Sequence, residues 1–315
     1  MEDKKIFKEK NFISIIVYLK NNENTIIEFL KNLDDMFYNR FISYEFVLVN
    51  DFCTDATLAK IKEIADSLRG NVNVVNLAYE YGIETAMLAG VDFAIGDFVY
   101  EFDSTFMDYE NDLIFKLYDK TAEGFDVVSA SPSDSIALSS KIFYNVLNKI
   151  SRKNMNLKTE TFRIVSRRAL NRVLKSKEKI RYRKATYHYS GFNTCVMEYK
   201  PKKHVKRNDL SLNEKLNFAS DIIVSFSDIG TKLASRLCFL FSIISIAMII
   251  YTIYSYLKID DIQAGWTTTM MFMSISFTGV FFVLAVISKY VNILLYEVQD
   301  KPRYLYKSVD RLSRK

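Results

Sequence analysis

The sequence predicts an α/β domain with a mostly parallel sheet, followed by a hairpin of two membrane-spanning helices. Two observations support this prediction. Short apolar, β-branched runs alternate with helix-length segments through residues 13–128, which is typical of a parallel sheet with helices on both faces. Near the C-terminus, two uncharged apolar runs at about 237–257 and 266–288 are each long enough to cross a bilayer of about 30 Å.

The predicted strands of the first domain are short and rich in Ile, Val, Phe and Tyr; they are residues 13–17, 44–49, 72–75 and 98–100. Helices follow the first three strands, at residues 25–36, 54–68 and 84–94. The polar cluster at residues 21–24 and the pair Thr54 and Asp55 supply helix N-cap side chains. The resulting order, strand and helix in turn, places the carboxyl ends of the strands along one edge of the sheet.

The two apolar runs are joined by the short segment 258–265, so they form a hairpin that leaves both ends of the chain on one side. Lys and Arg flank the outer ends of the runs, and the positive-inside rule therefore places both termini in the cytoplasm. The alternative is a pair of buried core helices, although core helices usually keep a polar face. The predicted organisation is a domain over 1–230, a membrane hairpin over 231–290 and a basic cytoplasmic tail over 291–315.

Acidic residues follow several of the predicted strands. Asp103 and Asp108 lie just past residues 98–100, and Asp51 and Asp55 lie just past residues 44–49. Ligands of open α/β sheets bind at this edge, and a carboxylate there is placed to hold a metal ion against a phosphate. The alternative is an ordinary polar turn. The motifs GxGxxG and GxxxxGK[ST] do not occur, which disfavours dinucleotide binding and P-loop hydrolysis.

Composition excludes other classes of protein. Three cysteines and two histidines without metal-ligand spacing disfavour a disulfide framework and a zinc site. The formal net charge is +6, and residues 152–207 are rich in Lys and Arg interleaved with aromatic residues. This stretch could bind a lipid phosphate or nucleic acid, or form a solvated basic face. Beside two membrane spans we favour the lipid, and residues 212–229 read as an amphipathic helix at the membrane interface.

Several motifs, in this order, resemble the family 2 glycosyltransferases that load sugars onto polyprenyl phosphates, the bactoprenol glucosyltransferase and dolichol-phosphate mannose synthase group. FVLVNDFCTDATL is similar to the family's VNDGSTDNTL, and YGIETAMLAGVDFAIGD to its FGKEAALLAGLDHATGD. TFRIVSRRAL and the segment YEVQDKPRYLY after the hairpin also match. The resemblance covers nearly the whole chain.

The resemblance implies a GT-A-like nucleotide-sugar-binding domain and an inverting transfer from a UDP- or GDP-linked sugar to a polyprenyl phosphate, serving cell-envelope glycan assembly or modification in a bacterium. It implies a multi-pass protein of the cytoplasmic membrane that uses a divalent ion, Mg²⁺ or Mn²⁺. A homo-oligomer is compatible with it, and a nucleic-acid partner is not expected. The implied site residues are catalytic Asp103, Asp108 and Arg163; nucleotide-binding Asp51, Asp55, Gly82 and Asp103; metal-binding Asp103 and Thr105; and acceptor-phosphate-binding Arg163, Arg167 and Arg168.

Departures from the family pattern cluster at the expected donor site. The family's DADLQD reads DSTFMD, so Thr105 replaces the second metal-binding Asp. Phe52 and Cys53 replace Gly-Ser after Asp51, and Thr161 replaces the Asp before Phe-Arg. These departures support an alternative function as a weakened or inactive family member that acts as a membrane-anchored scaffold or partner subunit.

Overall fold

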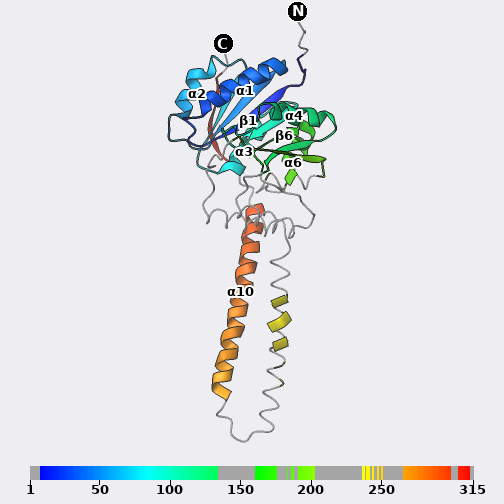
Figure 1. Cartoon of the computed structure of the whole chain (residues 1–315). Coiled ribbons are helices and arrows are strands. Elements are labelled where there is room, and N and C mark those ends of the chain that lie inside the picture. Colours follow the sequence, from blue (N-terminus) through cyan, green and yellow to red (C-terminus); the bar gives the residue numbers. More distant parts are fainter. Residues whose placement is uncertain are drawn as a thin grey trace, which may run out of the picture. The chain divides into compact units, whose positions relative to one another are not determined.

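The computed structural model describes residues 8–133, 160–175, 183, 186–187, 191–202, 236–237, 239–241, 243–244, 247, 250, 265–298 and 304–312. The chain divides into two compact units. The first comprises Met1–Asn148, Lys153–Ser211 and Lys301–Lys315, and the second comprises Lys149–Arg152 and Leu212–Asp300. The first unit contains an α/β domain, and the second contains a long helix, α10 (Figure 1).

Eight strands of the described residues form one sheet in the order β7-β5-β6-β4-β1-β2-β3-β8. The strands are β1 (Ile13–Leu19), β2 (Tyr44–Asn50), β3 (Asn71–Leu77), β4 (Phe98–Phe102), β5 (Val127–Pro132), β6 (Phe162–Ser166), β7 (Thr194–Tyr199) and β8 (Tyr306–Arg311). The neighbours β4, β1, β2 and β3 are parallel, whereas β6 runs antiparallel to both β4 and β5. The predicted α/β domain with a mostly parallel sheet is thus confirmed.

Helices cover both faces of the sheet because alternate residues of the buried strands point to opposite sides. The helices of this unit are α1 (Ile26–Arg40), α2 (Thr57–Ala65), α3 (Ile83–Phe93), α4 (Asp112–Ala122) and α6 (Arg167–Lys175). Ile15 and Val17 of β1 pack in a cluster with residues of α1, α2 and α4, whereas Ile16 packs with residues of α3 and α6.

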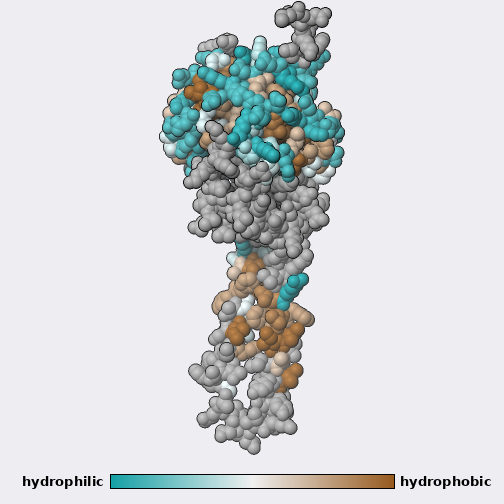
Figure 2. All heavy atoms as spheres, viewed as in Figure 1, coloured by the Kyte–Doolittle hydropathy of each residue, from teal (hydrophilic) through white to brown (hydrophobic). Residues whose placement is uncertain are grey.

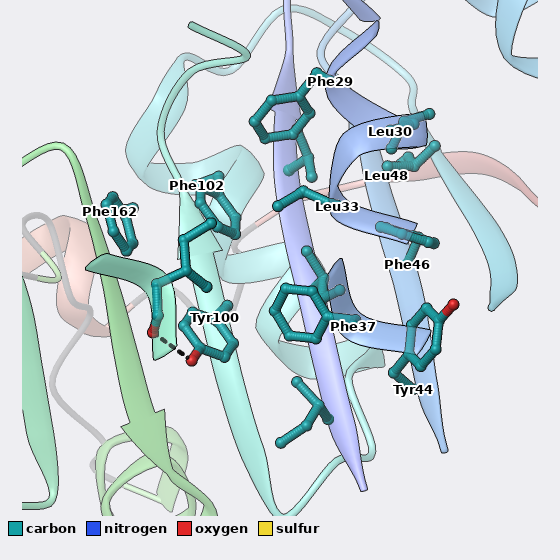
Figure 3. Packing of buried hydrophobic residues seen from close by; sticks show 14 of the residues in the cluster. Phe29, Leu30, Leu33, Phe37, Tyr44, Phe46, Leu48, Tyr100, Phe102 and Phe162 are labelled. Atoms are coloured by element: carbon teal, nitrogen blue, oxygen red, sulfur yellow. Dashed lines mark hydrogen bonds between the residues drawn. The ribbon is translucent and has the colours of Figure 1, made fainter. Parts of the chain in front are cut away.

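The larger apolar cluster is built around α1. Figure 3 shows Phe29, Leu33 and Phe37 of this helix above the side chains of β2, β4 and β6. Phe29 meets Phe102 edge-on at 5.5 Å between ring centroids, and Phe37 meets Tyr100 in the same way at 5.3 Å. Burial of these rings supplies the hydrophobic free energy that holds the helix layer on the sheet.

The smaller cluster brings α3 very close to the sheet. A Cβ atom on Gly90 would lie 2.4 Å from the Cγ2 of Ile16 and 2.8 Å from that of Val49, so the position requires glycine. This close approach places the first turn of α3 next to the carboxyl ends of β1 and β2.

The C-terminal segment returns to the first unit. Strand β8 pairs antiparallel with β3, and Asn76 Nδ2 donates hydrogen bonds to Ser308 Oγ (2.9 Å) and Asp310 Oδ2 (3.2 Å). The tail expected over residues 291–315 therefore includes an edge strand that we did not predict. Its polar, charged sequence is typical of exposed sheet edges and carries little local strand signal.

Helix α10 (Trp266–Val298) contains the second predicted membrane span, 266–288, while most of the first, 237–257, and the predicted interfacial helix at 212–229 lie outside the described residues. Among the helices that the structure describes, none is both long and apolar enough to cross a membrane. The predicted hairpin stays a prediction.

Candidate functional site

Three loops meet at the carboxyl edge of the parallel strands. Lys20, after β1, forms an ion pair with Glu80, after β3, at 2.8 Å. Asn22 Nδ2, also after β1, donates to Thr105 Oγ1, after β4, at 3.1 Å. The loops that carry the predicted site residues are therefore tied to one another, as expected for the ligand-binding edge of an α/β sheet.

Asp51 organises this edge with neutral hydrogen-bond donors. Its carboxylate is fully buried and accepts hydrogen bonds from Tyr81 N (2.8 Å), Gly82 N (2.9 Å) and Tyr18 Oη (3.0 Å). Gly82 has φ +80°, which favours glycine. Burial, and then the nearby Asp51 carboxylate, raise the pKa of Tyr18. The hydroxyl therefore stays protonated and donates a hydrogen bond to Asp51. Asp51 and Gly82 therefore come together, and Asp51 positions the loop that precedes α3.

Asp55 holds the loops after β1 and β2 together. Its carboxylate accepts hydrogen bonds from Glu23 N and from Thr57 N, both at 3.0 Å. Partial burial raises the pKa of Asp55, but the hydrogen bonds from Thr57 and then Glu23 outweigh this effect, and the net pKa lies below its usual value. Asp55 thus precedes α2 as an ionised group that accepts a hydrogen bond from the first backbone N–H of the helix.

Asp103 lies in a different electrostatic environment. Its Oδ1 accepts a hydrogen bond from Arg183 Nη2 at 3.0 Å, and its Oδ2 lies 3.5 Å from Arg163 Nη2. The Asp103 side chain is 13% exposed, whereas both arginine side chains are almost completely buried. Two of the predicted catalytic residues, Asp103 and Arg163, are therefore direct neighbours.

The two arginines belong to a buried cluster of charges. Arg163 Nε lies 3.3 Å from Glu160 and its Nη1 lies 3.7 Å from Glu101. Arg183 donates to Glu84 through its backbone N (2.9 Å) and Nε (3.2 Å), and it also forms an ion pair with Glu101. We call these six residues the charged cluster: Glu84, Glu101, Asp103, Glu160, Arg163 and Arg183.

Electrostatics keep both guanidinium groups charged. Burial lowers the pKa of Arg163, but Glu160, Glu101 and then Asp103 outweigh it and raise the pKa above its usual value. Burial also lowers the pKa of Arg183, and Glu101, Glu84 and Asp103 again raise it. The charged cluster holds four carboxylates and two guanidinium groups, so it carries two excess negative charges when all six are ionised.

The charged cluster also reaches the first turn of α3. Glu84 follows Gly82 by two residues, and Gly82 N is bound by Asp51. Asp51 is therefore linked to Asp103 through the backbone of residues 82–84 and the hydrogen bonds of Arg183 with Glu84 and Asp103. Tyr187 also belongs to this region, because its hydroxyl donates to Glu101.

Thr105 and Asp108 make contacts within the fold. The hydroxyl of Thr105 is buried and lies 2.7 Å from Thr25 Oγ1, in addition to its bond with Asn22. Asp108 Oδ1 accepts a hydrogen bond from Tyr199 Oη at 2.8 Å, and the same tyrosine oxygen lies 2.6 Å from Thr161 Oγ1. Both residues fasten the loop after β4 to neighbouring elements.

Arg167 and Arg168 lie at the opposite edge of the sheet from Asp51 and Asp103. Strand β6 runs antiparallel to β4, so α6 begins beside the start of β4. Arg167 donates to the backbone oxygens of Gly96 and Ala94, both at 2.8 Å, just after α3 ends. Arg168 is largely exposed and pairs with Asp126 at 2.7 Å. The structure does not bring these two arginines together with Arg163.

Of the two predicted metal ligands, Asp103 alone carries a carboxylate, and both of its oxygens face guanidinium groups. Within the described parts of the chain, no group of three or more His, Cys, Asp or Glu side chains is arranged to hold a metal ion. An ion at Asp103 would therefore take its other ligands from a bound diphosphate and from water, a common arrangement for Mg²⁺. Such an ion would offset the negative charge that a bound diphosphate brings close to the Asp103 carboxylate.

Sequence reasoning missed the roles of Glu84, Glu101, Arg183 and Tyr187. Glu101 offered a signal, since it is an acidic residue inside an apolar central strand and must find a buried partner. Arg183 offered none, because it stands within a long basic stretch whose members look alike in the sequence.

Comparisons with known proteins agree with this geometry. Residues 14–175 match the profile of the family described as Glycosyl transferase family 2. An uncharacterized glycosyltransferase of Synechocystis is 28% identical over 304 residues, which cover 93% of this chain and 94% of that protein. A bactoprenol glucosyl transferase of Shigella phage SfX is 28% identical over 307 residues, covering 94% of this chain and 99% of that protein.

Among solved structures, the crystal structure of a mycobacterial protein is similar to this chain with a TM-score of 0.50 and 14% sequence identity. The similar region covers 68% of this chain and 73% of that chain. At this level of identity the likeness supports the fold alone.

Proposed function

The chain belongs to glycosyl transferase family 2, and we propose that it transfers a sugar from a nucleotide sugar to a polyprenyl phosphate at a membrane, with inversion at the anomeric carbon. Its α/β unit is GT-A-like. The observation that carries the proposal is the charged cluster around Asp103, which lies at the ligand-binding edge of the sheet and is hydrogen-bonded to the Asp51 loop. The match to nearly the full length of a bactoprenol glucosyl transferase supports a polyprenyl acceptor.

In the proposed reaction, an oxygen of the lipid phosphate forms a bond to the anomeric carbon while the bond from that carbon to the diphosphate breaks. Positive charge builds on the sugar ring in the transition state. A lipid phosphate is already anionic at pH 7, so it attacks with little help from a general base. The reaction therefore depends mainly on positioning and on stabilising the leaving diphosphate.

The residues of this chain would act through position and charge. Asp103 would hold a divalent ion, Mg²⁺ or Mn²⁺, and such an ion neutralises the charge that develops on the leaving diphosphate. Arg163 and Arg183 would fix the orientation of Asp103 from the buried side. Asp51 would shape the loop that receives the nucleoside. Direct contact between Arg163 and the lipid phosphate stays a prediction, as do the acceptor roles of Arg167 and Arg168.

Membrane attachment is part of the proposal. Apolar side chains are exposed along α10, where Figure 2 shows hydrophobic surface. They include Met273, Ile275, Phe277, Val280, Phe281, Phe282, Leu284, Ile287, Val291 and Leu294. Exposed apolar surface of this extent is unusual for a surface in water, and contact with lipid would explain it. We propose that both termini face the cytoplasm, as the Lys and Arg asymmetry indicates.

A second candidate function is a non-catalytic scaffold that keeps the fold. It is favoured by Thr105 and Thr161, which stand where the family has aspartate and whose hydroxyls are hydrogen-bonded within the fold. The enzyme is favoured by Asp103 and Arg163, which keep the family's residue types and are direct neighbours in the structure.

The test is direct. Purified full-length protein in detergent would be incubated with polyprenyl phosphate, a panel of UDP- and GDP-linked sugars, and Mg²⁺ or Mn²⁺, and the lipid fraction would be analysed for a glycolipid. A glycolipid with one donor supports the enzyme. The absence of product with every donor, together with nucleotide binding that persists, would favour the scaffold.

A further inference from the structure

Phe52 has a backbone conformation that is unfavourable for its side chain. Its φ is +58°, in the left-handed region, and it is a bulky residue. Such a conformation costs about 1 kcal/mol or more in a residue other than glycine. The family motif that this segment resembles has glycine at this position. The chain therefore keeps a phenylalanine where the backbone favours glycine.

The surrounding hydrogen bonds hold this conformation. Cys53 N donates to Asn50 Oδ1 at 2.8 Å, and Asn21 N donates to Cys53 Sγ at 3.3 Å. Lys20 Nζ donates to the backbone oxygens of Asp51 (3.2 Å) and Phe52 (3.4 Å). The turn is thus fixed from both sides, and relaxation of Phe52 would break several of these bonds. Strain that is maintained in this way is commonly found at ligand sites.

Phe52 is not a member of either apolar cluster of the described residues. The residue is 50% exposed and makes no ring contact with the described residues. It directly follows Asp51, at the edge where the loops after β1, β2 and β3 are tied together. Tyr79, 64% exposed, lies on the neighbouring loop, whose residues 81 and 82 are bound by Asp51. Exposed aromatic rings therefore flank the Asp51 loop.

We propose that Phe52 is a nucleobase-stacking residue of the donor site, whose ring packs against the base of the nucleotide sugar. This inference rests on the proposed function. In the proposed function an ion at Asp103 serves the diphosphate, but a nucleoside also has a flat, uncharged base that needs an apolar face. Stacking does not require hydrogen-bond readout, so Phe52 would add affinity for several bases, and selection among bases would come from other groups.

The test uses two variants whose predicted effects separate binding from stability. Phe52→Gly removes the ring and also the strain, so the thermal midpoint of the full-length protein should rise. Its affinity for UDP, measured by calorimetry with Mn²⁺, should fall about 5- to 100-fold, the range expected for loss of one base–aromatic stack. Phe52→Tyr keeps the ring and should bind UDP like the wild type.

Two controls locate the effect on the base. Inorganic pyrophosphate has no base, so its affinity should be equal for wild type and Phe52→Gly. Ile42→Gly removes another exposed apolar side chain, 60% exposed, between α1 and β2, and should leave UDP affinity unchanged. Equal UDP affinity for Phe52→Gly and wild type, or an equal loss for pyrophosphate, would overturn the stacking role while leaving the proposed function intact. A wild-type protein that binds no nucleoside diphosphate would overturn both.

Discussion

Asp51 follows β2 and Asp103 follows β4, two strands of the same sheet that are separated by β1, yet their environments differ. Asp51 is completely buried and is satisfied by two backbone N–H groups and a tyrosine hydroxyl, all of them neutral. Asp103 is partly exposed and faces two guanidinium groups. The first arrangement uses the carboxylate to shape a loop, whereas the second places it in a cluster of buried charged groups. An aspartate at a strand end therefore indicates a ligand edge, but its partners decide its role.

The largest expected effect concerns Arg183, one of the two arginines that contact Asp103. Arg183→Met would leave Glu101, which is fully buried, without one of its ion-pair partners. Removal of one partner from a buried ion pair costs about 3–5 kcal/mol, and the free energy of unfolding, measured by denaturant titration, should fall by this amount. The control is Arg168→Met, which removes a largely exposed guanidinium from the buried Asp126; this carboxylate keeps its hydrogen bond from Ser166, so the variant should cost less. Similar losses for the two variants would show that the buried Arg183 contributes no more to the free energy of unfolding than the exposed Arg168.

A smaller effect distinguishes the two aspartates themselves. In Asp51→Asn, one carboxylate oxygen becomes an amide nitrogen that faces an N–H or O–H donor. An unsatisfied buried group of this kind costs about 1–3 kcal/mol, so the thermal midpoint should fall even without ligand.

Asp103→Asn should behave in the opposite way. Both guanidinium groups that contact Asp103 keep other carboxylates, Glu101 and Glu160 for Arg163 and Glu84 and Glu101 for Arg183, so the unliganded protein should lose little stability. The additional stabilisation by UDP in Mn²⁺ over UDP in EDTA, read by thermal unfolding, should disappear. If Asp103→Asn keeps this dependence on Mn²⁺ while Asp51→Asn loses it, we have assigned the ion to the wrong carboxylate.

The smallest effect is a pH dependence at Asp55. Its pKa in the folded protein lies below the ordinary value of 3.8, so it stabilises the folded state above that pH. This contribution is lost as the pH falls below 3.8 and through the folded-state pKa. Asp55→Asn should therefore unfold at a lower midpoint than the wild type at pH 7, and this difference should shrink as the pH falls below 3.8. Glu63→Gln, on the exposed face of α2, serves as the control, and a pH dependence in it equal to the Asp55 effect would contradict this prediction.

The alternation of strands and helices, and the placement of Asp51, Asp55 and Asp103 at strand ends, could be predicted from local patterns alone. Apolar periodicity specifies which residues must be buried, and the direction of parallel strands then brings their carboxyl ends to one edge. The position of β8 could not be predicted, because a polar edge strand is stabilised by pairing with a distant strand and not by its own residues.

The charged cluster forms only in the tertiary structure. The distances in sequence among Glu84, Glu101 and Arg183 range from 17 to 99 positions. Only the packing of α3 and of Arg183 against β4 brings these residues together. Tertiary structure also separates Arg163 from Arg167, although they are only four residues apart in the chain. Arg163 lies near the start of β6 and Arg167 follows its end, so the two lie at opposite edges of the sheet. A sequence shows which residues are charged. The partner of each charged residue, its burial and hence its contribution to stability depend on contacts between distant residues.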